Sequence, residues 1–232
     1  MGRGCRHLSC LAAIAALTAA ADLVPGGVGQ ASSSHAAFVW RLDVRLTVAP
    51  GLPPLARAAL REETETIWRN ARVRIHWLSG AAEPAAARAL RVLVTARPPV
   101  SPVGGARWAV GELLRFDGNG AIAIASIAGA RRIVNETRAP GGAELPDVLD
   151  HRLGVVLGRA VAHEIGHYLL NTNTHATRGL MRASFDSREF TDLRGGVFDL
   201  DEEAGARLLA TTDPASPSPA LLPLRGFSYN NR

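Results

Sequence analysis

Hydrophobic and polar residues repeat with two different periods along the chain, and these periods predict its strands and helices. Alternation of apolar and polar residues, which is typical of strands with one buried face, covers residues 38–48, 72–78 and 91–95. Apolar residues at helical spacing predict helices over residues 53–71, 146–170 and 200–210. The buried stripe of the first helix is expected to contain Leu55, Ala59, Leu60, Ile67 and Trp68.

The segment between the third strand and the second helix contains a predicted hairpin. Two apolar runs within residues 113–128 flank the sequence DGNG at 117–120, which is typical of a tight turn. A calcium-binding loop is the alternative, but too few oxygen ligands follow. The long helix begins with Pro146 and is apolar on most faces, so much of it should be buried. The order of these elements predicts one α/β domain, of the α+β kind, over residues 38–210.

The first residues have the layout of a secretory signal. Arg3 and Arg6 precede an uncharged apolar run at residues 8–21, and small residues lead to a cleavage site that ends at Ala31. The run is short for a bilayer span, which disfavours the alternative of an uncleaved membrane anchor. We therefore expect residues 1–31 to be a signal peptide and the protein to be secreted or periplasmic.

Composition adds three constraints to this picture. Residues 32–37 are expected to be a linker, and residues 211–232 a low-complexity tail. Both cysteines, Cys5 and Cys10, lie in the predicted signal peptide, so the exported domain would contain no disulfide. The formal net charge is +5, but the basic residues, all of them arginine, are dispersed among acidic residues. This dispersal favours a solvated surface and argues against a nucleic-acid partner.

Residues 161–181 (VAHEIGHYLLNTNTHATRGLM) contain the strongest chemical signal. His163 and His167 are four positions apart, which places both imidazoles on one face of a helix, within reach of one metal ion. Glu164 flanks that position, where a carboxylate can act as a general base. The neighbouring residues are apolar, and burying these polar side chains without a metal would be costly. The sequence therefore predicts a Zn²⁺ site.

A catalytic zinc ion usually has three protein ligands and one open position. The leading candidate for the third ligand is His175. In a continuous helix it would lie about 12 Å beyond His167, so the chain must reverse soon after Leu170. Asn171 and Asn173 permit a reversal, since asparagine tolerates the left-handed conformation that ends helices. The alternative third ligand is a later carboxylate, that of Glu189 or Glu202.

This segment resembles the catalytic motif of the metzincins, and among them the matrixin-like zinc endopeptidases. Their signature is H-E-x-x-H-x-x-G-x-x-H followed by a turn that contains methionine. Residues 163–167 (HEIGH) match it directly, and residues 179–181 (GLM) are similar to the turn. Two features depart from the signature. His175 lies further along the chain than the third histidine of the signature, and Leu170 stands in place of the glycine.

The resemblance implies a metzincin-like fold, with a twisted mixed sheet, a long active-site helix and a small C-terminal subdomain. It implies a Zn²⁺ ion bound by His163, His167 and His175, with Met181 beneath it. It also implies hydrolysis of peptide bonds by a zinc-bound water that Glu164 activates as the catalytic base. The expected partner is therefore a protein or peptide substrate. We also expect the enzyme to be a monomer and, after removal of the signal peptide, not to be stably inserted in a membrane.

Two hypotheses compete with a secreted zinc endopeptidase: a non-catalytic, zinc-stabilised binding domain, and a metal-dependent hydrolase of a non-peptide bond. A purely structural site needs no general base, so Glu164 favours catalysis.

A substrate is expected to pair with a sheet edge as an added strand. The candidate edge is the run from Gly120 to Ala128, and an interior strand is the alternative. Two roles are open for Phe185, Phe190 and Phe198. They line a pocket for a substrate side chain, or they pack the C-terminal subdomain.

Overall fold

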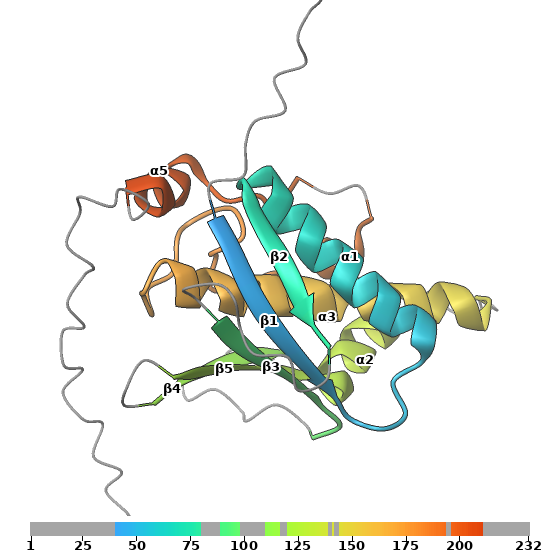
Figure 1. Cartoon of the computed structure of the whole chain (residues 1–232). Helices are drawn as coiled ribbons and strands as arrows, with labels where there is room; N and C mark the ends of the chain where they lie inside the picture. Colours follow the sequence, from blue (N-terminus) through green and yellow to red (C-terminus); the bar gives the residue numbers. More distant parts are fainter. Residues whose placement is uncertain are drawn as a thin grey trace, which may run out of the picture. The chain divides into compact units, whose positions relative to one another are not determined.

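The computed structural model places five described strands in one sheet (Figure 1). The described residues are 40–79, 89–97, 110–116, 120–138, 141, 144–193 and 196–210. The strands are β1 (Trp40–Val48), β2 (Val73–Leu78), β3 (Ala89–Thr95), β4 (Gly111–Arg115) and β5 (Ala121–Ser126). The predicted signal peptide, linker and tail lie outside the described residues, as do residues 117–119 of the predicted turn.

The sheet has the strand order β2-β1-β3-β5-β4. β1 pairs in parallel with β2 and β3, and β3 pairs in parallel with β5. β4 runs antiparallel to β5, and the Phe116 N–H donates to the Gly120 carbonyl oxygen at 2.9 Å, as expected for a hairpin. Together with the helices, this mixed sheet confirms the predicted α/β class.

The edge of the sheet beside β5 is β4, which corrects the prediction made from the sequence. The expected edge was the run from Gly120 to Ala128, but β5 lies between β3 and β4. The run also stops being a strand at Ser126, whose hydroxyl accepts the Gly129 N–H at 3.0 Å and starts helix α2 (Ile127–Glu136). A serine cap satisfies a free N–H group of the first helical turn. The apolar sequence therefore continues as a helix that the alternation did not predict.

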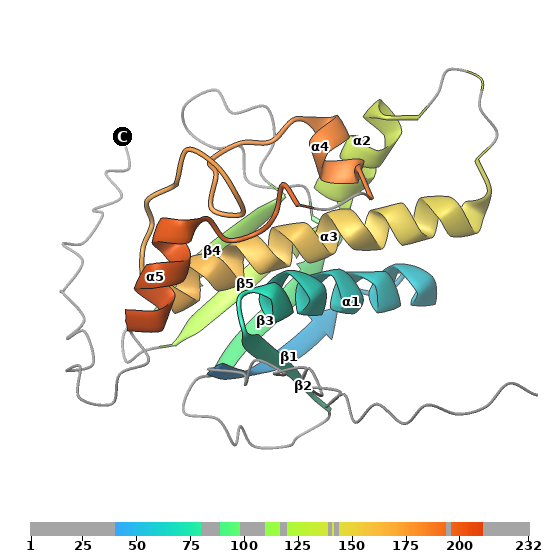
Figure 2. The same cartoon turned by 90° about the horizontal axis from the view of Figure 1, so that it is seen from above.

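Helices α1 (Pro54–Asn70) and α3 (Pro146–Leu169) lie side by side on one face of the sheet (Figure 2). Glycine in α3 permits close packing, since a Cβ atom on Gly158 would lie 2.7 Å from the Leu60 carbonyl oxygen. The Thr64 hydroxyl lies 2.8 Å from that oxygen and 3.1 Å from the Gly158 carbonyl oxygen. The backbones of the two helices thus approach each other closely, and α1 fixes the position of α3 on the sheet.

The buried face of α1 differs from the predicted stripe at one end. Residues buried as predicted are Ala59, Leu60, Ile67 and Trp68. Leu55, however, is 39% exposed, and Ala56 is buried in its place. The backbone of Ala56 lies where a Cβ atom on Gly154 of α3 would be, so this position in the interface needs a small side chain. Leu55 is turned about 100° away from Ala56 around the helix, toward solvent.

Two short helices follow α3, namely α4 (Ser187–Thr191) and α5 (Glu202–Ala210). The sequence pattern predicts α5 but not α4. α4 is formed by a capping box, in which Asp186 and Glu189 each accept the backbone N–H of the other, at 2.8 Å and 2.9 Å. None of the described helices is both long enough and apolar enough to cross a bilayer.

Aromatic packing joins the C-terminal segment to α3. The ring centroids of Phe185, Phe190 and Phe198 lie 4.6 to 5.3 Å apart. Arg159 of α3 lies over Phe198 at 4.4 Å and donates to the carbonyl oxygens of Glu189 and Phe190 at 3.0 Å. The phenylalanines therefore pack the C-terminal segment against α3, and such packing was one of the two expected roles.

Candidate metal centre

The C-terminal half of α3 carries His163, Glu164 and His167. The helix is anchored there by fully buried side chains, among them Leu157, Val161 and Ile165. His163 and His167 are one helical turn apart on the same face, and their Nε2 atoms lie 3.0 Å apart. The helix therefore directs both imidazoles at one point.

The chain reverses direction immediately after α3, as the asparagines predict. The Leu170 N–H still bonds to the Gly166 carbonyl oxygen at 2.9 Å, but Asn171 adopts the left-handed conformation with a φ of 47°. The Thr172 N–H then bonds back to the His167 carbonyl oxygen at 3.2 Å. Since a left-handed residue ends a helix, the following residues fold back past the helix end.

This reversal brings His175 next to the two histidines of α3. The candidate ligand nitrogens of His163, His167 and His175 all lie within 4.8 Å of one another. Between ring centroids, His175 lies 5.4 Å from His163 and 4.9 Å from His167. Within the part of the chain that the structure describes, these three residues are the group of metal-ligating side chains that can hold an ion.

Backbone carbonyl groups set the tautomers of the two helical histidines. His163 Nδ1 lies 2.7 Å from the Leu180 carbonyl oxygen, and His167 Nδ1 lies 2.8 Å from that of Thr172. A carbonyl oxygen only accepts, so each Nδ1 carries the proton and each Nε2 presents a lone pair. Two lone pairs facing each other at 3.0 Å repel unless a cation lies between them. The residues therefore fit a metal ion bound through Nε2, with each imidazole oriented by its second nitrogen.

Burial keeps these imidazoles neutral. It lowers the pKa of His163 to about 4, although the hydrogen bond to the Leu180 carbonyl group acts in the opposite direction. Burial also lowers the pKa of His167, and partial desolvation lowers that of His175, although the His175 side chain is largely exposed. Because neutral imidazole is the form that binds a metal ion, the three side chains are ready to bind one near pH 7.

Glu164 is 6% exposed, and its carboxyl group lies against the backbone of β4. A Cβ atom on Gly111 would lie 2.6 Å from Glu164 Oε1, so glycine leaves the space that this group fills. Burial, with a smaller contribution from the negative charge of Glu112, raises the pKa of Glu164 to about 8. A carboxyl group with a raised pKa, on the residue next to a potential metal ligand, is a candidate for proton transfer.

A tight turn that begins at Gly179 supports the histidines. Gly179 has a φ of 71°, and the Leu180 N–H donates to the Asp199 carbonyl oxygen at 2.8 Å, so the Leu180 carbonyl group is held toward His163. The next residue, Met181, is 3% exposed, and its sulfur occupies the space beside Gly166 of α3. The methionine therefore packs against the helix between the two histidine positions.

The acidic alternatives to His175 are engaged elsewhere. Glu189 accepts a hydrogen bond from Arg182 at 2.6 Å and another from the Asp186 N–H at 2.9 Å. Glu202 lies in the first turn of α5, and neither glutamate belongs to the histidine group. The geometry therefore favours His175 over either carboxylate.

Several parts of this site cannot be found from the sequence pattern. Gly111 makes room for Glu164, and a glycine in a strand is only a weak sign of close approach. The carbonyl groups of Leu180 and Thr172 leave no sequence signal, because every residue has one. Arg115, at the end of β4, donates to the His167 carbonyl oxygen at 2.6 Å, and its role depends on strand pairing.

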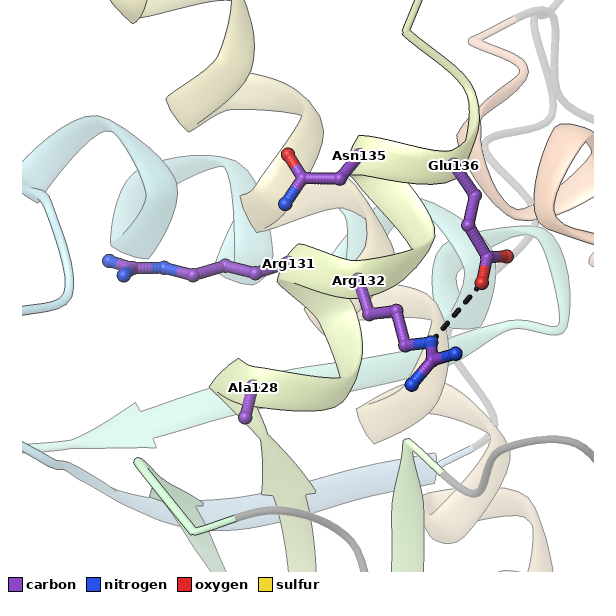
Figure 3. A pocket seen from close by; sticks show the side chains of 5 residues that line it. All are labelled: Ala128, Arg131, Arg132, Asn135 and Glu136. Carbon is purple, nitrogen blue, oxygen red and sulfur yellow. Dashed lines mark hydrogen bonds and ion pairs between the residues drawn. The ribbon is translucent and has the colours of Figure 1, made fainter.

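A surface hollow of about 570 Å³ lies on helix α2 (Figure 3). Its lining residues are Ala128, Arg131, Arg132, Asn135 and Glu136. Arg132 Nε and Glu136 Oε1 form an ion pair at 3.2 Å, one helical turn apart. No histidine lines this hollow, so it is separate from the metal centre.

No protein-family model matches the chain, and no curated protein sequence matches it. Among solved structures, archaemetzincin from Methanopyrus kandleri is similar to this chain, with a TM-score of 0.45 and 15% sequence identity. The match covers 73% of this chain and 94% of that one. A likeness this distant assigns neither a family nor an activity, so the function has to be inferred from the residues of the site.

Proposed function

We propose that this protein is an exported zinc-dependent endopeptidase that acts as a monomer. The observation that carries the proposal is the convergence of three imidazoles, two of them on the helix that also carries the buried Glu164. His163, His167 and His175 would bind the metal ion, and Glu164 would act as the catalytic base. The signal-like sequence of residues 1–31 supports export, either to the periplasm or out of the cell.

The donor set favours zinc. Three neutral imidazoles, two of which give their Nδ1 protons to carbonyl groups, match the three-histidine sites of catalytic zinc. Calcium and magnesium, by contrast, prefer oxygen ligands. Bound zinc supplies Lewis acidity, which polarises the carbonyl group of the substrate and acidifies water at the site.

Glu164 would move the proton that peptide hydrolysis requires. Its carboxylate accepts a proton from the attacking water and then delivers it to the nitrogen of the leaving amine. In the metal-free protein, burial favours the protonated form of Glu164, with a pKa of about 8. The positive charge of a bound cation favours the ionised form, so Glu164 becomes an effective base at neutral pH when the site is loaded.

An extended polypeptide is the substrate that β4 favours. β4 pairs with β5 on one side, and no other strand of the described sheet pairs with its second side. Such an edge can bind a peptide through main-chain hydrogen bonds. Because Gly111 of β4 lies against the Glu164 carboxyl group, a peptide added to β4 would pass beside the catalytic base.

The proposal is tested by incubating the purified mature protein with casein and with a mixed peptide library, with added zinc and with a chelator. We expect cleavage that depends on zinc. Glu164→Gln should keep its zinc and lose at least about 100-fold in kcat/KM, since it cannot accept the proton. Glu203→Gln, an exposed residue in the first turn of α5, is the matched control and should cleave like the wild type.

Each alternative predicts a different result. Stoichiometric zinc without cleavage of any peptide would indicate a non-catalytic, zinc-stabilised domain. Zinc-dependent cleavage of esters, with peptides left intact, would indicate a hydrolase of a non-peptide bond. Full activity of Glu164→Gln would remove Glu164 from the mechanism without affecting the assignment of the metal ligands.

A further inference from the structure

Arg115, the last residue of β4, joins the edge strand to the end of α3. Its Nη2 donates to the His167 carbonyl oxygen at 2.6 Å, and its Nη1 donates to Asn171 Oδ1 at 2.9 Å. The guanidinium group is planar and presents its donors in a rigid fork. It therefore holds the two acceptors at a set separation, which a flexible ammonium group with its single nitrogen would not do.

The two acceptors of Arg115 are the groups that define the reversal after α3. The His167 carbonyl oxygen also accepts the Thr172 N–H at 3.2 Å, which closes the turn. Asn171 is the residue with a φ of 47°, a conformation that costs free energy for any residue with a side chain. The bond from Arg115 to its side chain offsets part of that cost and selects one orientation of the asparagine.

This turn positions two groups of the metal centre, the Thr172 carbonyl group and His175. Thr172 follows Asn171 directly, and its carbonyl oxygen accepts the Nδ1 proton of His167 at 2.8 Å. His175 then follows within the same short segment, with its candidate ligand nitrogen no more than 4.8 Å from those of the helical histidines. Any change in the backbone at Asn171 would therefore move both the carbonyl group that orients His167 and the third imidazole.

We propose that Arg115 is a positioning residue for the metal centre. It acts through Asn171, keeps the reversal in the conformation that sets the His167 tautomer and places His175, and couples these ligands to β4. This inference rests on the proposed function only in taking the ion to be zinc and β4 to be the substrate edge. The two side-chain hydrogen bonds of Arg115 described above go to the His167 carbonyl oxygen and to Asn171 Oδ1, and neither acceptor is an imidazole nitrogen.

A purely structural role, in which Arg115 only attaches β4 to α3, predicts a different response to mutation. In that case Arg115→Met would lower stability without altering the metal site. The positioning role instead predicts weaker zinc binding, an altered ligand geometry, and rescue by any change that favours the left-handed conformation at residue 171. Glycine is such a change, because it adopts positive φ at little cost.

The experiment measures zinc affinity by competition with a chromogenic chelator, and records the visible spectrum of the Co²⁺-loaded protein. For Arg115→Met we expect zinc affinity to fall by about 10- to 100-fold, as for other residues that orient metal ligands, and the Co²⁺ bands to shift. Arg115→Lys should bind with intermediate affinity, because one ammonium can reach only one acceptor at a time. Arg91→Met, an exposed arginine of β3, is the matched control and should bind zinc like the wild type.

The decisive comparison adds Asn171→Gly to Arg115→Met. Recovery of several-fold in zinc affinity would support action through the turn, and no recovery would overturn it. Zinc affinity and Co²⁺ bands unchanged from the wild type in Arg115→Met would also overturn it. If Arg115→Met fails to fold, Arg115→Lys with and without Asn171→Gly decides by the same criteria. Because these readouts need no hydrolysis, an inactive protein that binds zinc would contradict the endopeptidase proposal and leave the role of Arg115 standing.

Discussion

Helix α3 and the segment that follows it contribute to one site by different physical means. In α3, the helical repeat alone aligns His163 and His167, and buried neighbours hold the helix in place. Between the end of α3 and the start of α4 the chain forms turns and an isolated bridge, and His175 is exposed. Its position depends on a left-handed asparagine and on hydrogen bonds to residues far away in the sequence.

The same contrast holds for the groups that orient the ligands. The helical histidines each give an Nδ1 proton to a carbonyl group of the later segment, at 2.7 and 2.8 Å. That segment is held in turn by the bond from the Ala176 N–H to the Met181 carbonyl oxygen at 2.8 Å. The helix thus holds its ligands rigidly, whereas the following segment is held in place by hydrogen bonds. Substitutions in the two regions should therefore have effects of different magnitude.

The largest expected effect is loss of a helical ligand. His163→Ala should reduce zinc affinity by more than the roughly 10- to 100-fold typical of residues that only orient a ligand, because the rigid helix offers no replacement. His175→Ala should cost less, since water can enter at its exposed position. Competition with a chelator measures both, and His151→Ala, earlier on α3, is the control. Undiminished zinc binding by His175→Ala would exclude it as the third ligand.

Disturbing the packing of α3 comes next. Gly158→Ala places a Cβ atom 2.7 Å from the Leu60 carbonyl oxygen and 2.8 Å from Glu63 Cβ, and the backbone of α1 cannot move aside easily. We expect the free energy of unfolding to fall by about 1–3 kcal/mol, as measured by urea denaturation with zinc present. Gly205→Ala in α5 meets no atom within 4 Å and should be neutral or stabilising. Equal stability of the two variants would contradict the packing described for α1 and α3.

The pH dependence of stability tests the burial of Glu164 in the metal-free protein. Its pKa rises from 4.5 to about 8 on folding, so the folded state binds more protons than the unfolded state between these values. The proton on Glu164 therefore stabilises the folded state. This contribution to the free energy of unfolding is complete below pH 4.5, declines as the pH rises, and is lost above pH 8. Glu164→Gln does not titrate. Its Tm should therefore exceed that of the wild type by an amount that grows from pH 5 to pH 9.

Zinc provides the control for this measurement. A bound cation favours the ionised carboxylate, so the difference in Tm between Glu164→Gln and the wild type should shrink when zinc is saturating. The lowered pKa of His163 makes stability fall as the pH drops from 6.5 to about 4, but it does so in both proteins and cancels in the comparison. A difference in Tm that stays constant with pH would show that Glu164 is not buried as described.

The smallest effect is expected where the helix meets the methionine. A Cβ atom on Gly166 would occupy the place of the Met181 sulfur, but the end of a flexible side chain can shift. Gly166→Ala should therefore lower the free energy of unfolding by about 1 kcal/mol. Combining it with Met181→Val, which vacates that space, should give less than the sum of the two single changes. Additive effects in denaturant titrations would mean that the two residues do not share this contact.

Local pattern predicts most elements of the fold but fails where a serine or a capping box intervenes. The strands and the long helices are predicted because their apolar faces repeat over several turns or pleats. α2 is missed because the apolar run of β5 continues past Ser126, whose hydroxyl cap turns the chain into a helix. α4 is missed because it is short and is stabilised by reciprocal bonds between Asp186 and Glu189.

The sequence by itself determined that His163 and His167 share a helical face beside Glu164, and that this helix must end near Asn171. These features depend on the helical repeat and on local conformational preference, which neighbouring residues decide. Only the tertiary structure decided that β4 is the edge strand, that Gly111 makes room for Glu164, and that Arg115 meets Asn171. Such contacts join residues about fifty positions apart, and their free energy exists only after the sheet has paired and the helix has packed against it.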